Sequence, residues 1–117
     1  MAAPALQAVD EDGTTWNDPS EEQLRDLLAG LSLTCRFVVL RRLDLEPADQ
    51  HYIQVYLNDD LSCDVEYREG GSDRHFQAWV PHDDEAFAVD AVAQLLQAWA
   101  FGRPGWRDAL SWVPWSQ

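Results

Sequence analysis

Hydrophobic and polar residues alternate along much of residues 52–80, and this period of two constrains the fold more than any other feature. The alternation is clearest in residues 52–57 and 61–68, and a third β-rich run over 74–80 stops at Pro81. Turn-forming residues separate the runs, at Asn58-Asp59-Asp60 and at residues 69–73, which include two glycines. Successive side chains of a strand point to opposite faces. The pattern therefore predicts three consecutive antiparallel strands with one buried and one wet face, namely Tyr52–Leu57, Leu61–Arg68 and Arg74–Val80.

Two helices are expected to flank these strands. The first begins with Asp18 as N-cap and Pro19 in the first helical position, and it ends near Gly30. Its apolar stripe is Leu24, Leu27, Leu28 and Leu31. The second is capped by Asp83 or Asp84 and ends near Gly102. Its sheet-facing stripe is Ala88, Val92, Leu95, Leu96 and Trp99.

The remaining segments complete one domain. Thr34 to Leu43 is rich in β-forming residues and is predicted as a strand. Residues 1–15 are expected to form a flexible segment or a short edge strand around Leu6 to Val9, and residues 16–117 a single domain. One helical turn is expected at 106–110, followed by a short strand or extended tail. The predicted class is α+β, with a mainly antiparallel sheet of four to five strands packed against a long C-terminal helix, and an N-terminal helix.

The charge balance of the chain limits its partners. Its 117 residues carry 21 acidic and 8 basic side chains, for a net charge of −13. Such a surface repels phosphate backbones and anionic lipid, so nucleic-acid and membrane binding are disfavoured. It favours fast association with a basic protein. Plain solubility explains the same charge equally well, because charge bears on association and not on fold.

The N-terminus and the cysteines indicate a cytoplasmic protein. The first residues lack a basic start and a long apolar segment, which is unlike a signal peptide, and no run reaches membrane-spanning length. Cys35 and Cys63 lie in apolar runs and are expected to be small core residues rather than a disulfide. No CxxC pair is present, which argues against zinc-ribbon and thioredoxin sites.

Few residues suggest chemistry. His75 could act as a general base oriented by Glu66, but a half-exposed strand histidine is the favoured interpretation because no serine or cysteine nucleophile stands at a suggestive turn. The run from His82 to Glu85 could be drawn as a metal site, although carboxylates at a helix start already have a capping role. Asn58-Asp59-Asp60 lacks the spacing and distal Glu of a calcium loop. We therefore expect no catalytic residue, no metal and no cofactor.

Six tryptophans are many for a chain of this length. Trp99 belongs to the helix stripe and is expected in the core. Trp106 and Trp112 are expected to fold back over the sheet, whereas Trp115 could remain exposed, as tryptophans at interface hot spots do.

Several of these segments together resemble the Imm1-type immunity proteins of bacterial polymorphic toxin systems. The similarity covers roughly residues 50–115 and rests on YIQVY (Tyr52–Tyr56), EYREG (Glu66–Gly70) and WAFGRPGW (Trp99–Trp106), with Trp112 and Trp115 as terminal aromatics. The resemblance implies an α+β protein that binds and silences a toxin domain. Toxins of such systems are often nucleases or nucleic-acid deaminases. The family supplies no catalytic residues to carry over.

The leading hypothesis is a cytoplasmic immunity protein that occludes the active site of a toxin. Its binding residues would be acidic side chains of the strands and turns together with the terminal tryptophan: Asp59, Asp60, Asp64, Glu66, Glu69, Asp73 and Trp115. A solvated acidic face is the competing interpretation of the same residues. Two other functions stay open, a small enzyme using His75 with an acidic partner, and a structural or chaperone-like adaptor using the C-terminal aromatics.

Overall fold

A seven-stranded antiparallel sheet forms one of the two layers of the described structure. The computed structural model describes residues 5–46, 50–81 and 87–114, with the side chains of the last range described from residue 91 onward. The strand order is β2-β1-β3-β4-β5-β6-β7. The strands are β1 (Leu6–Asp10), β2 (Thr15–Asn17), β3 (Phe37–Arg42), β4 (His51–Leu57), β5 (Cys63–Glu69), β6 (His75–Val80) and β7 (Val113–Pro114).

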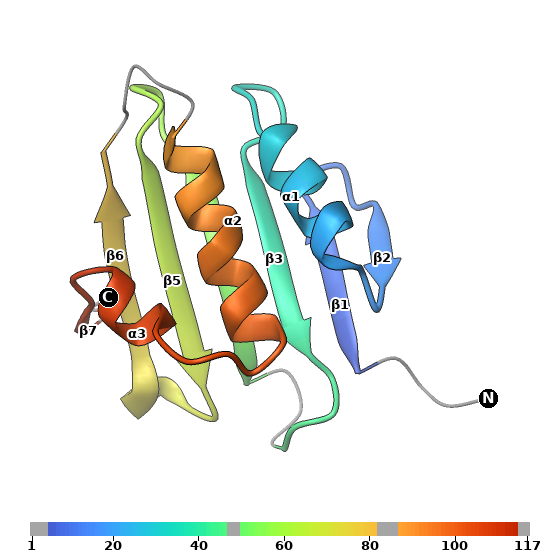
Figure 1. Ribbon diagram of the computed structural model, residues 1–117, viewed down its shortest axis with the longest axis vertical. Helices are drawn as coiled ribbons and strands as arrows, with labels where there is room; N and C mark the ends of the chain where they lie inside the picture. Colours follow the sequence, from blue (N-terminus) through green and yellow to red (C-terminus); the bar gives the residue numbers. More distant parts are fainter. Residues whose placement is uncertain (1–4, 47–49, 82–86, 115–117) are drawn as a thin grey trace.

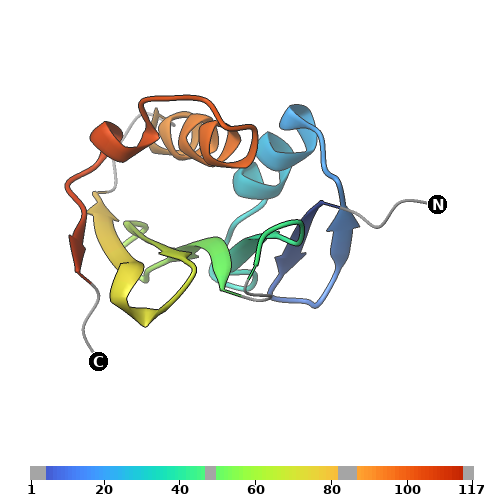
Figure 2. The same cartoon turned by 90° about the horizontal axis from the view of Figure 1, so that it is seen from below.

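Helices form a second layer on one face of this sheet (Figure 1, Figure 2). They are α1 (Glu21–Ala29), α2 (Phe87–Ala100) and the short α3 (Trp106–Ala109), and a 3₁₀ turn, η1 (Ser72–Arg74), precedes β6. In Figure 1, α2 lies over the middle strands and α1 over the half that contains β1 and β3. The two helices divide the covered face between them.

The expected four- to five-stranded sheet on a long C-terminal helix was wrong. Both ends of the described chain add strands, and among the described residues no helix is longer than the 14 residues of α2. The added β2 and β7 have three and two residues, too few for a period of two to register in the sequence. The segment that includes β1 was expected to be flexible or an edge strand, but β1 lies between β2 and β3.

The central prediction is confirmed, because β4, β5 and β6 are neighbours in sequence order. Val55 pairs with Val65, and Val65 pairs with Ala78, all buried on the helix side. The turn residues were assigned less well. Leu61 has a positive φ of 69° and is 43% exposed, while Ser62 is 2% exposed, so both lie in the β4–β5 turn and β5 begins only at Cys63.

The core lies between the helices and the sheet. Val92, Leu95, Leu96 and Trp99 of α2 are buried against it, as predicted, at exposures of 8% or less. Leu24 and Leu28 of α1 join Leu40 and Ile53 of the sheet in the same cluster. Ala88 and the proposed caps Asp83 and Asp84 lie outside the described side chains.

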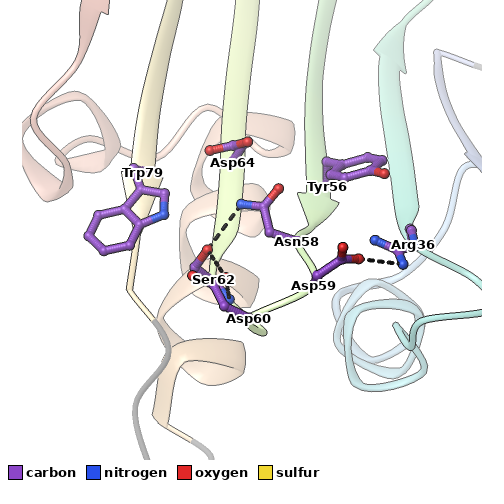
Figure 3. A pocket seen from close by; sticks show the side chains of 8 residues that line it. All are labelled: Arg36, Tyr56, Asn58, Asp59, Asp60, Ser62, Asp64 and Trp79. Carbon is purple, nitrogen blue, oxygen red and sulfur yellow. Dashed lines mark hydrogen bonds and ion pairs between the residues drawn. The ribbon is translucent and has the colours of Figure 1, made fainter.

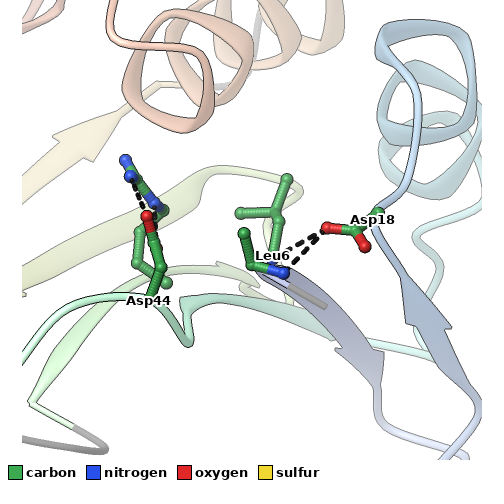
Figure 4. A network of polar contacts seen from close by, with 5 residues as sticks. Leu6, Asp18 and Asp44 are labelled. Atoms are coloured by element: carbon green, nitrogen blue, oxygen red, sulfur yellow. Dashed lines mark hydrogen bonds and ion pairs between the residues drawn. The ribbon is translucent and has the colours of Figure 1, made fainter. Parts of the chain in front are cut away.

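The start of α1 differs from the prediction by two residues. Ser20 is the N-cap, and it forms a reciprocal capping box with Gln23. Asp18 instead has a φ of 48° and accepts hydrogen bonds from the backbone N–H groups of Ala5 and Leu6, at 3.0 and 3.1 Å (Figure 4). Asp and Ser cap helices about equally well, so the tertiary contact with β1 decided which one does.

Candidate functional site

The sheet has two unlike faces. In the part of the chain that the structure describes, all three helices lie on one face, and the other face is uncovered (Figure 2). Directly paired residues share a face. The register therefore places three rows on the uncovered side: Tyr56, Asp64 and Trp79; Gln54, Glu66 and Gln77; Tyr52, Arg68 and His75. The central strand β5 thus contributes charged side chains to this face, with aromatic, glutamine and histidine side chains on its neighbours.

A shallow hollow of about 540 Å³ opens at the end of this face beside the β4–β5 turn (Figure 3). The uncovered strands β4, β5 and β6 contribute Tyr56, Asp64 and Trp79, and the turn contributes two further aspartates. The complete lining is Arg36, Tyr56, Asn58, Asp59, Asp60, Ser62, Asp64 and Trp79. We call this surface the acidic hollow.

The turn beneath the acidic hollow is held by its own hydrogen bonds. The amide N–H of Asn58 donates to the carbonyl of Ser62 at 2.8 Å, and the Asn58 side-chain amide donates to the Ser62 hydroxyl at 3.0 Å. Ser62 in turn donates its backbone N–H to the Asp60 carboxylate at 2.9 Å. The Asp60 carboxylate therefore stabilises the turn, and the same hydrogen bonds hold this carboxylate in place.

Arg36 neutralises a second carboxylate at the rim. Its Nη2 lies 2.6 Å from Oδ1 of Asp59. The hydrogen bond to Asp59 is the main reason that the pKa of the Arg36 guanidinium is raised, with a smaller contribution from Tyr56. The Asp59 side chain is 87% exposed, so this pair is in contact with solvent and weakly held.

Asp64 and Trp79 are the strand residues of the acidic hollow that are exposed to solvent. They face each other across β5 and β6, and both are exposed, Trp79 by 59%. Within the described residues, Asp64 has neither a hydrogen-bond nor an ion-pair partner. Trp79 also borders a second hollow of 390 Å³, so it stands as a ridge between two depressions.

The predicted acidic residues do not form one surface. Asp59, Asp60 and Asp64 meet in the acidic hollow, and Glu66 shares its face. Glu69 lies on the helix side and pairs with Arg107 of α3. Asp73 lies in η1, at the far end of β5, whose seven residues span about 20 Å. Trp115 lies outside the described residues.

His75 does lie beside Glu66, as the enzyme hypothesis requires, with Nε2 3.5 Å from Oε2. The ring is only 6% exposed, and it meets Tyr52 edge-on at a centroid distance of 5.8 Å. A general base must come within hydrogen-bond reach of its substrate. Burial of the imidazole in the sheet surface therefore argues against this hypothesis.

The C-terminal aromatics pack against the body of the protein. Tyr67 meets Trp106 and Trp112 edge-on at centroid distances of 4.8 and 4.7 Å, and it stacks on Phe76 at 5.3 Å. Burial raises the pKa of the Tyr67 hydroxyl. Trp106 and Trp112 thus have the structural role preferred from the sequence, which weakens the adaptor hypothesis.

One metal-compatible group lies elsewhere among the described residues. The ligand atoms of Asp10, Asp12 and Cys35 lie within 4.8 Å of one another. Sequence reasoning missed this group because Cys35 is distant along the chain. Three donors are fewer than a structural zinc site uses, and one thiol with two carboxylates suits neither hard nor soft ions. The run from His82 to Glu85 lies outside the described residues.

Sequence reasoning also missed Trp79, Tyr56 and Arg36. Two of them could have been found from the lengths of the turns. These lengths set how the predicted strands pair, and the pairing places Tyr56 and Trp79 on either side of Asp64. Arg36 precedes β3 and reaches the hollow only in the folded sheet.

None of the helices in the described ranges is long and apolar enough to cross a membrane.

Comparisons of this chain with models of protein families, with curated proteins and with solved structures found no match. The resemblance to Imm1-type immunity proteins therefore stays a prediction from the sequence.

Proposed function

We propose that this protein is a binding protein that neutralises a toxin domain by holding a basic surface of the toxin against the uncovered face of its sheet. The observation that carries the proposal is the exposed Trp79 beside Asp64, at the end of a sheet face that no described helix covers. Exposed tryptophans are enriched among the residues that dominate interface energies. The acidic hollow supplies the charge, and Trp79 supplies the apolar contact.

The net charge of −13 supports a basic partner. A nuclease or nucleic-acid deaminase binds its substrate in an electropositive channel. A rigid acidic surface competes for such a channel, and its field accelerates the encounter. Screening limits this field to about 8 Å at physiological salt. The association rate should therefore fall as salt rises, while the dissociation rate changes less.

The test is a growth assay with the product of the open reading frame immediately upstream of this gene. Cells expressing that product alone should stop growing, and cells that also express this protein should grow. Asp64→Lys should abolish protection. Asp26→Lys is the matched control, because it makes the same charge change on an exposed residue of α1, on the covered side of the sheet.

Two results would contradict the proposal. An upstream product that is harmless, or that is toxic with or without this protein, removes the neutralising function. Full protection by Asp64→Lys, with surface plasmon resonance showing unchanged binding, keeps a partner but moves the interface away from the acidic hollow. Both variants should have the same thermal midpoint as the wild type, which excludes loss of folding as the cause.

A further inference from the structure

Arg107 of α3 is held by two aromatic rings and a carboxylate on the helix side of the sheet. The guanidinium of Arg107 lies 4.5 Å from the ring centroid of Trp106 and 5.8 Å from that of Tyr67. It also forms an ion pair with Glu69. Guanidinium groups favour this setting, because the planar cation stacks on ring faces while its N–H groups donate to the carboxylate.

The acidic hollow presents the same three kinds of group on the uncovered face. Tyr56, Asp64 and Trp79 lie side by side on β4, β5 and β6 (Figure 3). Adjacent strands are about 4.8 Å apart, so the two aromatic side chains leave the sheet about 10 Å apart with the carboxylate between them. A guanidinium group paired with Asp64 would therefore have an aromatic side chain on either side of it.

The carboxylates of the acidic hollow differ in whether the chain itself supplies a partner for them. Three aspartates line it against one arginine. Asp59 is paired with Arg36, and Asp60 accepts hydrogen bonds from Ser62. Asp64 lies between the two rings and has no ion-pair partner among the described residues. The carboxylate without an ion-pair partner among the described residues, which a bound cation could contact, is therefore Asp64, between the two aromatic residues.

We propose that the acidic hollow binds an arginine side chain of the partner protein, paired with Asp64 and flanked by the aromatic side chains of Tyr56 and Trp79. This inference rests on the proposed function, since it assigns the kind of residue by which the basic partner is recognised. Arginine suits the site better than lysine because its flat, weakly hydrated cation can lie against an aromatic ring while its N–H groups donate to Asp64. Lysine would keep only the point charge.

The test uses three short peptides with blocked ends, glycyl-arginyl-glycine and its lysine and citrulline counterparts. Each is titrated to millimolar concentration into the isotope-labelled full chain, and the indole N–H signals of the tryptophans are followed by NMR. The Trp79 signal is assigned by its disappearance in Trp79→Phe. We expect the arginine peptide to shift this signal saturably, the lysine peptide to bind more weakly, and citrulline to have no effect. The Trp106 signal should stay in place.

Asp64→Asn should weaken binding of the arginine peptide about fivefold, the upper range for an exposed charge pair. Asp26→Asn, which removes the same charge from an exposed residue of α1, should leave it unchanged. Equal binding of citrulline or lysine, equal loss in both variants, or an unmoved Trp79 signal would overturn the inference. An unmoved signal together with protection in the growth assay would reject only the arginine site. Peptide binding without protection would instead reject the neutralising function.

Discussion

Arg107 and Arg36 both pair with a carboxylate beside an aromatic residue, Arg107 in the cluster beneath α3 and Arg36 at the rim of the acidic hollow. Arg107 closes a cluster in which its partner Glu69 is 25% exposed and the rings of Tyr67, Trp106 and Trp112 contact one another. Arg36 pairs with an Asp59 that is 87% exposed, at the rim of a hollow that exposes Trp79. The carboxylate partner and the rings around Arg107 are thus largely enclosed by the chain, whereas Asp59 and Trp79 at the hollow are exposed to solvent.

The loss of unfolding free energy on substitution should differ most between two adjacent residues of β4 that point to opposite faces of the sheet. Ile53→Ala removes a side chain with 0% exposure from the helix side and should cost about 2–5 kcal/mol of unfolding free energy. Gln54→Ala, on the uncovered side, should cost no more than about 0.5 kcal/mol. Urea unfolding of both variants measures this directly, and equal losses would mean that the two faces are wrongly assigned.

A tryptophan from each region gives a second contrast. Trp106→Ala removes a ring packed on Tyr67 and should lower stability by about 2 kcal/mol, less than for a fully buried aromatic. Trp79→Ala, at 59% exposure, should leave the thermal midpoint nearly unchanged while abolishing toxin binding. If Trp79→Ala destabilised the protein as much as Trp106→Ala, the uncovered face would need a structural explanation.

The two arginines test the same contrast through charge. Arg107→Gln removes a cation held by two rings and Glu69, and should cost about 1 kcal/mol. Arg36→Gln should not change the stability measurably, because its partner is almost fully in solvent. Denaturant titrations at low and high salt check both. A larger loss for Arg36→Gln would reverse the assignment of structural and free regions.

The smallest expected effect is a change in stability at alkaline pH that depends on the buried Tyr67. The pKa of Tyr67 is raised in the folded state by burial, so its stabilising effect is complete below the unfolded pKa of about 10 and is lost as pH rises through the folded pKa. The chain has no lysine, which leaves few other groups titrating there. Stability should fall above about pH 10 in the wild type, and less steeply in Tyr67→Phe. Identical pH profiles would show that Tyr67 ionises as freely as an exposed tyrosine.

The core of the sheet was predictable because β4 and β5 each repeat the period of two over seven residues, and β6 follows them after a short turn as a β-rich run. The covering stripe of α2 was predictable for the same kind of reason. The short β2 and β7 were not, since they are strands only by pairing with longer neighbours. Asp18 shows the same limit, because its contact with β1 removed it from the helix cap that its residue type favours.

The candidate site was predictable in part. Asp59, Asp60 and Asp64 were expected together because a single turn joins their strands, and they do meet in the acidic hollow. Glu69 was grouped with them although it has the parity of the buried residues Val65 and Tyr67, and that parity places it on the helix side. Trp79 was overlooked because its surroundings depend on the register between β5 and β6.

By itself the sequence determined which side chains share a face, because the direction of alternate side chains is a local property of an extended backbone. Only the tertiary structure decided that both helices cover the same face and that Glu69 meets Arg107, 38 residues away. The physical reason is that burial and ion pairing depend on which surfaces the packed chain brings together. That packing completed the cluster around Arg107 and left Asp64 and Trp79 in solvent.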